Sequence, residues 1–135
     1  MFFKKNNKNN DFVKVAALLI HAAKIDENFS KKEEEIIKQA LLKLGADGQN
    51  IENTINAGKI LEENTNQILD FTKEVKIMDE EKKREIIESL WRIIYSNKAA
   101  DVYETSLMRR LAGLLYIDNK IMGNIKERIK KEYSA

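Results

Sequence analysis

Residues 12–23 constrain the fold more than any other part of this sequence. The segment is apolar on almost every side of a helical wheel, and only Lys14 and His21 interrupt it. A helix that is apolar all round must be covered on several faces, so we expect this one to lie at the centre of the fold. It is shorter than the ~20 apolar residues that a helix needs to cross a bilayer, which favours a buried core helix.

The composition favours helices and a single domain. The chain has 135 residues, which suits one core, and 43% of them are apolar. It contains no Pro and only five Gly, so helices can run without interruption, and strand-rich folds lack their usual turn residues. Charged residues make up 34%, above the roughly 25% of an average domain, as expected for many solvated helix faces. We therefore predict an all-α fold, a compact bundle of about seven helices.

The composition also excludes several classes of protein. The absence of Cys removes disulfides, thiolate catalysis and zinc–thiolate sites, and the net charge of +2 gives no reason to expect binding to nucleic acid or a membrane surface. Residues 1–11 lack the apolar run of about 7–15 residues that a secretory signal needs. We expect them to form a frayed, polar lead-in before a single domain at 12–135, in a cytoplasmic protein. A membrane-surface anchor that uses Phe2, Phe3 and the nearby lysines is the alternative.

Capping residues and apolar spacing predict where the helices lie. Ser30 begins a capping box that Glu33 completes, and Gly45 follows the second helix, where a left-handed cap is favoured. Asp47 is the expected N-cap of the third helix, whose interior Gly58 costs ~1 kcal/mol relative to Ala. The helices are expected at about 11–25, 31–44, 48–62, 65–78, 80–96, 101–116 and from 118 onward.

The sequence repeats itself at an offset of 71 residues. Asp26 corresponds to Asn97, and the capping-box Glu33 corresponds to Glu104. Each copy has an apolar helix, a polar turn of about five residues, a capping box and an amphipathic helix. Two copies related by a pseudo-twofold axis would place their apolar helices side by side and bring both turns to one end, with the third and fourth helices joining them. Because helical hairpins resemble one another easily, a chance match is the alternative.

The two turns carry a resemblance to a known family, whose pattern is Ala-Asp-Gly-x-apolar-x-x-x-Glu after an apolar helix. The first copy reads Ile-Asp-Glu-Asn-Phe-Ser-Lys-Lys-Glu at 25–33, and the second reads Ser-Asn-Lys-Ala-Ala-Asp-Val-Tyr-Glu at 96–104. Over residues 12–131 the chain resembles the tellurite-resistance protein B-like (TerB-like) domain, as a small stand-alone member. The resemblance implies an all-helical domain, an acidic site for divalent metal, an association with tellurite and other stress responses, and no established enzyme activity.

The candidate metal ligands are Asp26, Glu33, Asn97 and Glu104. Carboxylates without Cys or His beside them are hard oxygen ligands, which suit magnesium, calcium or manganese. The chain departs from the family pattern because Asn97 replaces an Asp, and this lowers the negative charge of the site. The alternative is structural, since Glu33 and Glu104 lie where a capping-box glutamate accepts a hydrogen bond from its own N-cap amide.

The candidate partner-binding residues are Trp91, Tyr95 and Arg109. The two aromatic residues lie one helical turn apart, where core packing is the usual role and an aromatic patch that faces a partner is the alternative. His21 is the only His, and we expect a packed core residue rather than a ligand or base. Basic residues near the C-terminus alternate with Glu and lack interleaved aromatics, so binding to nucleic acid is not expected.

The functional hypothesis is a non-enzymatic, divalent-metal-responsive accessory protein of bacterial stress response. No nucleophile with its base, no acid–base pair and no phosphate-binding loop is recognisable, so an enzyme is not expected. The alternative is a metal-independent helical scaffold that docks a protein partner, for example a membrane-associated one.

Overall fold

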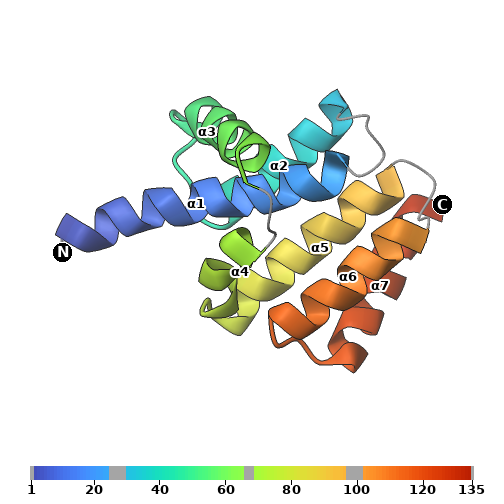
Figure 1. The fold of residues 1–135 in the computed structure, drawn as a ribbon. Coiled ribbons are helices and arrows are strands. Elements are labelled where there is room, and N and C mark those ends of the chain that lie inside the picture. Colours follow the sequence, from blue (N-terminus) through green and yellow to red (C-terminus); the bar gives the residue numbers. More distant parts are fainter. Residues whose placement is uncertain (1, 25–29, 66–68, 97–101, 135) are drawn as a thin grey trace.

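The computed structural model describes residues 2–24, 30–65, 69–96 and 102–134, and this part of the chain contains seven α-helices and no strand (Figure 1). The helices are α1 (Phe2–Ala23), α2 (Lys31–Lys43), α3 (Ile51–Glu63), α4 (Leu69–Lys76), α5 (Glu80–Ser96), α6 (Val102–Leu114) and α7 (Asn119–Ser134). The predicted all-α class is therefore confirmed. Among the described residues, no helix combines the length and the apolar character that a membrane span requires.

The central helix is α1, as its apolar surface predicts. Residues 15–20 are buried on every side, because α2, α3, α4 and α5 all pack against this helix. The start of α1 corrects our expectation, since the helix begins at Phe2 rather than near 11. Residues 2–10 are thus helical instead of forming a frayed lead-in, and Figure 1 shows them projecting from the bundle. No Pro or Gly stops the helix there, and extending an existing helix is far easier than starting one.

The second core helix is α5, and its expected bounds of 80–96 are confirmed. The side chains that form its predicted apolar stripe are all buried, and the helix packs against α1, α2 and α7. These buried side chains are Ile86, Leu90, Trp91, Ile93 and Ile94. Asp79 precedes the helix, and its Oδ1 accepts a hydrogen bond of 2.9 Å from the amide of Lys82. Local capping and burial therefore agree on this element.

Two other helix ends differ from the sequence-based expectation. The N-cap position of α3 is Asn50, and Asp47 instead closes a turn by accepting a hydrogen bond of 3.0 Å from the amide of Gln49. The expected helix to Tyr116 ends at Leu114, because Tyr116 adopts a left-handed backbone with φ of 57°. In both places a polar or aromatic residue that could continue a helix makes a tight turn.

The 71-residue repeat is visible in the backbone of α2 and α6. Each helix has 13 residues, and both of their bounds differ by the same 71 positions. Each ends in a Schellman motif: the amide of Ala46 donates to Leu41 O, and the amide of Ile117 donates to Ala112 O, both at 2.9 Å. The left-handed residue is Gly45 in the first copy and Tyr116 in the second.

The repeat is longer than the helical hairpin that the sequence suggested. Helix α3 packs on α1, α7 packs on α5, and α1 contacts α5 directly. We therefore assign α3 to the first copy, as the counterpart of α7, which leaves α4 as the connection between two three-helix units. The sequence hid this relation because α3 begins three residues later than an offset of 71 would place it, after an additional turn.

Candidate functional site

Glu33 is the only predicted metal ligand whose side chain the structure describes. Asp26 and Asn97 lie outside the described residues, as does the side chain of Glu104 on α6. Within the described residues, no three His, Cys, Asp or Glu side chains lie close enough to share a metal ion. The predicted convergence of the four residues is therefore a prediction that the structure leaves open.

Glu33 forms the predicted capping box. Its Oε1 accepts hydrogen bonds from the amide of Ser30 at 2.8 Å and from the Ser30 hydroxyl at 3.0 Å. The amide of Glu33 in turn donates to Ser30 Oγ at 3.2 Å, and the side chain of Glu33 is fully buried. The structural role of this carboxylate is thus established, and any metal would have to share it with the cap.

The helix ends that border the two repeated turns lie on one side of the molecule. Figure 1 shows the C-terminal ends of α1 and α5 there, together with the N-terminal ends of α2 and α6. Glu33 and Glu104 occupy the third position of α2 and of α6, respectively. This placement agrees with the arrangement that a pseudo-twofold repeat predicts.

Trp91 and Arg109, two of the predicted partner-binding residues, line one groove between α6 and α7. The groove has a volume of about 180 Å³. Its walls also include Met108, Ala112, Asn119, Met122, Gly123 and Lys126. Trp91 is only 2% exposed, so it is a core residue at the edge of a groove rather than part of an exposed aromatic patch.

Tyr95 supports Trp91 instead of lining this groove. The two rings stack at 5.8 Å between centroids, with an interplanar angle of 25°. Burial, followed by the nearby carboxylate of Glu127, raises the pKa of Tyr95. The structure thus brings two of the three predicted residues to one groove and places the third behind them.

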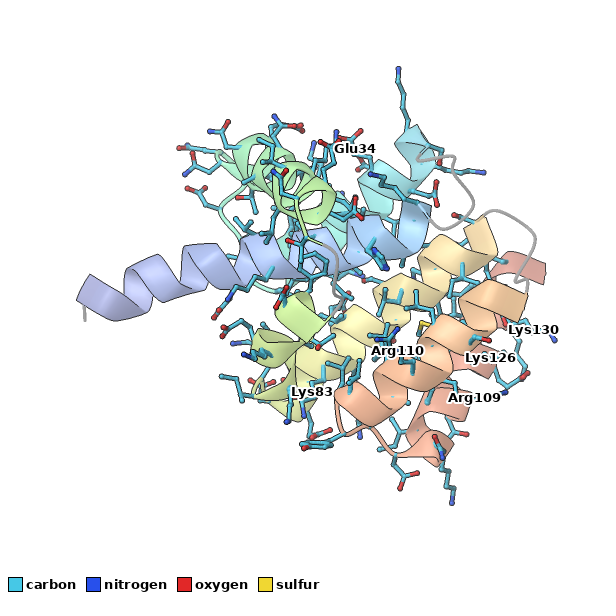
Figure 2. All side chains as sticks on the ribbon, in the orientation of Figure 1. Glu34, Lys83, Arg109, Arg110, Lys126 and Lys130 are labelled. Atoms are coloured by element: carbon cyan, nitrogen blue, oxygen red, sulfur yellow. The ribbon has the colours of Figure 1, made fainter. Side chains whose placement is uncertain are left out.

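Sequence reasoning did not predict Lys126, which faces the same groove from α7. Its Nζ lies 5.4 Å from the centroid of the Trp91 ring, within the range of a cation–π contact. Neither Lys126 nor Arg109 forms an ion pair with any side chain that the structure describes. Figure 2 shows these two residues along the same edge of the molecule, whereas Arg110 lies apart from them. Because 17 residues separate Arg109 from Lys126, no local pattern links them.

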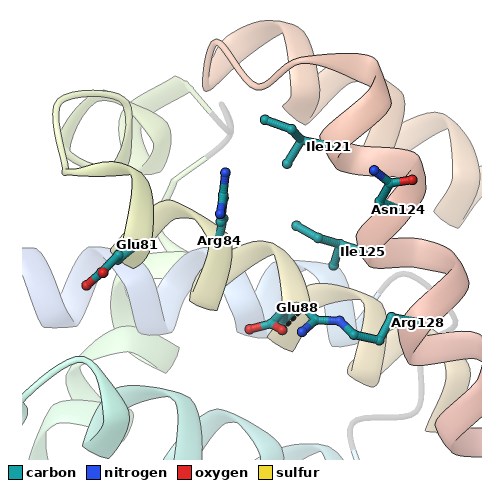
Figure 3. A pocket seen from close by; sticks show the side chains of 7 residues that line it. All are labelled: Glu81, Arg84, Glu88, Ile121, Asn124, Ile125 and Arg128. Atoms are coloured by element: carbon teal, nitrogen blue, oxygen red, sulfur yellow. Dashed lines mark hydrogen bonds and ion pairs between the residues drawn. The ribbon is translucent and has the colours of Figure 1, made fainter.

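A larger groove of about 490 Å³ lies between α5 and α7 (Figure 3). Ile121 and Ile125 provide its apolar part, and Arg84 points into the space between the helices. Its other charged residues oppose one another, since Arg128 forms an ion pair with Glu88 and Glu81 lines the same groove. Two acidic and two basic side chains balance here, so this groove has no clear preference for the charge of a ligand.

His21 is partly exposed rather than packed in the core as predicted. Its Nδ1 lies 3.2 Å from Glu62 Oε2, while Lys24 donates to Glu62 Oε1 at 2.7 Å. Burial alone would raise the pKa of Glu62, but the hydrogen bonds from Lys24 and His21 outweigh this effect and lower it. This cluster links α1 to α3, and sequence spacing could not reveal it because about 40 residues separate its members.

The second three-helix unit has an ion pair in the equivalent place. Arg92 follows His21 by 71 residues, and its guanidinium contacts both carboxylate oxygens of Glu132 at 3.3 Å. His21 and Glu62 are 41 residues apart, and Arg92 and Glu132 are 40 residues apart. The two units are therefore joined internally by an ion pair between their first and third helices.

Comparison with known proteins yields one match, to the family model described as "Tellurite resistance protein TerB", over residues 12–127. No curated protein and no solved structure matches the chain. The matched region contains all but the first turns of α1 and the last turns of α7, and thus both three-helix units. This coverage agrees with the resemblance at the two repeated turns, and we conclude that the chain belongs to the TerB family.

Proposed function

We propose that this protein is a non-enzymatic, cytoplasmic accessory protein of a tellurite-resistance-like stress response, and that it holds a divalent cation between its two units. The observation that carries the proposal is the placement of Glu33 and Glu104 at equivalent positions of α2 and α6, whose N-terminal ends lie on one side of the molecule. Asp26 and Asn97 would complete the ligand set from the adjoining turns.

The donor set suits magnesium, calcium or manganese, because all four ligands present oxygen. A bound ion would neutralise carboxylates that otherwise repel one another, and it would stabilise the folded state by mass action. Oε1 of Glu33 is engaged with Ser30, so an ion would share this carboxylate with the cap or displace the hydrogen bonds of the cap.

The test compares variants that separate ligation from capping. We expect millimolar magnesium, calcium or manganese to raise the melting temperature of the native protein, and Asp26→Asn to abolish that rise. Glu33→Gln keeps a side chain that can complete a capping box but removes the negative charge, so it should lose the metal response and keep its metal-free stability. Glu33→Ala removes the cap as well and should cost about 0.5–2 kcal/mol without metal. A melting temperature indifferent to all three ions would refute the metal site.

The second candidate function is a metal-independent scaffold that docks a protein partner. The observation that favours it is the groove between α6 and α7, where Arg109 and Lys126 flank the buried Trp91. This function needs no convergence of carboxylates, so it would survive a negative result in the metal experiment.

A further inference from the structure

We propose that the groove between α6 and α7 binds an acidic segment of a partner protein, with a partner carboxylate between Arg109 and Lys126. The proposal rests on the scaffold function above and gives it a partner of defined chemistry. It is independent of the metal site, because none of the four candidate ligands lines this groove.

The charge of the groove favours an anionic ligand. A cation approaches from each wall, Arg109 from α6 and Lys126 from α7, and no carboxylate is among the described residues that line the groove. Asn119 adds an amide that can donate a hydrogen bond. The groove between α5 and α7 differs, since Glu81 and Glu88 offset its two arginines. Guanidinium and ammonium groups bind carboxylates through charge-assisted hydrogen bonds, the stronger class of such bonds.

The floor of the groove favours a ligand with an apolar part. Met108 and Met122 are buried beside Trp91, and methionine side chains adapt to varied apolar shapes. The indole Nε1 of Trp91 is buried and has no hydrogen-bond partner among the described residues. A ligand that brings an acceptor to this nitrogen would satisfy a donor that the folded chain leaves unpaired.

The size and shape of the groove suit a side chain of a docked peptide. A volume of about 180 Å³ accommodates one or two side chains rather than a large cofactor, for which pockets of about 300–1,000 Å³ are typical. Gly123 leaves the α7 wall open, because a Cβ atom added there would meet nothing within 4 Å. An acidic residue next to an aliphatic one would place its carboxylate between the two cations and its neighbour over the methionines.

The test uses the intrinsic fluorescence of Trp91, which is the only Trp of the chain. The full-length protein, in EDTA, is titrated with a synthetic peptide of alternating Glu and Leu and with its Gln–Leu counterpart. We expect the Glu peptide to change the emission saturably, to bind about tenfold or more tightly than the Gln peptide, and to weaken as salt is added. EDTA keeps this result separate from that of the metal experiment.

Matched variants assign the binding to the groove. Arg109→Glu should weaken the Glu peptide about tenfold or more, whereas Arg110→Glu, a neighbouring exposed arginine outside the groove, should have little effect. Gly123→Phe should block binding by filling the groove, and Gly113→Phe provides the control, because its site is also open but does not line the groove.

Three outcomes would overturn the proposal. Equal binding of the Glu and Gln peptides would leave a scaffold with an apolar docking surface and remove the role of the carboxylate. Inorganic phosphate that displaces the peptide and causes the same emission change would assign the groove to a small anion. Equal affinities in Arg109→Glu and Arg110→Glu, or no response to the Glu peptide, would exclude this groove as its site.

Discussion

The two three-helix units share one architecture and pack it differently. In the first unit, α3 meets α1 at Gly58, where an added Cβ would lie 2.7 Å from Ala16 Cβ. The residues 71 positions later are Ile129 and Ile87, both fully buried. The first unit thus joins its helices through small residues and close backbones, whereas the second places branched side chains at the equivalent positions. Residue size, with the helical arrangement kept, therefore decides how closely the third helix of each unit approaches the first.

The closeness of packing bears on where ligands can bind. Both grooves with charged walls, the one beside Trp91 and the one beside Arg84, are lined only by residues of the second unit. The ion pair between first and third helices also differs, since the first unit uses His21 and the second uses Arg92. We infer that duplication of one unit left a tightly packed half and a half with grooves suited to binding.

Ile129→Ala should have the largest effect on stability. Ile129 is fully buried in α7, and truncating a buried Ile removes apolar contacts and leaves a cavity, which costs about 2–5 kcal/mol. Urea unfolding of the variant and the native protein would measure the loss. A cost below about 1 kcal/mol would show that branched side chains do not hold the second unit together.

Gly58→Ala should destabilise the protein even though Ala is the better helix former. The new methyl group would lie 2.7 Å from Ala16 Cβ and 3.2 Å from the amide nitrogen of Ala17, so α1 or α3 must shift. Overpacking of this kind costs about 1–3 kcal/mol, against about 1 kcal/mol gained from helix propensity.

Gly113→Ala is the matched control for Gly58→Ala, measured by the same urea unfolding. A Cβ atom at position 113 meets nothing within 4 Å, so this change should be neutral or stabilising by up to about 1 kcal/mol. If Gly58→Ala were equally stabilising, the close contact between α1 and α3 would be disproved.

Exchanges at the two Schellman motifs should have opposite signs. Gly45→Ala forces a residue with a Cβ to adopt φ of 107° and should cost about 1–2 kcal/mol. Tyr116→Gly removes the same kind of strain at φ of 57° but loses the contact of the ring with Lys76, so it should change stability by less than about 1 kcal/mol. Thermal unfolding of both variants would check the difference, and an equal loss would contradict the shared geometry.

Glu62→Gln should have the smallest effect at neutral pH, below about 1 kcal/mol, because Lys24 and His21 are each more than a third exposed. The pKa of Glu62 is lowered in the folded state, so its contribution is present above the unfolded pKa of about 4.3 and is lost as pH falls through the folded pKa. Urea unfolding between about pH 3 and pH 7 should therefore show a smaller acid loss in the variant. An unchanged pH dependence would mean that the cluster does not contribute to folding.

The sequence predicted those features that depend on neighbouring residues. The capping box of Ser30 and Glu33, the bounds of α5 and the buried position of residues 15–20 all follow from local spacing. The role of Gly58 was misjudged as a mere cost to α3, because only the tertiary structure shows Ala16 lying against it.

The groove and the ion pairs depend on long-range packing, which one sequence does not reveal. Arg109 and Lys126 come together only because α6 and α7 flank Trp91. Ile60 shows the same limit from the other side, since its spacing suggested a core position and the structure leaves it 60% exposed. Helical periodicity predicts a face, but the neighbouring helices decide how much of that face is covered.

The central claim is that one unit occurs twice at an offset of 71, and scalar couplings across hydrogen bonds test it directly by nuclear magnetic resonance. The account predicts a coupling from the amide nitrogen of Ala46 to the carbonyl carbon of Leu41, and an equivalent coupling from Ile117 to Ala112. A coupling from Ile117 to Gly113 instead would show that α6 continues past Leu114 and ends differently from α2. That result would contradict the shared three-helix unit.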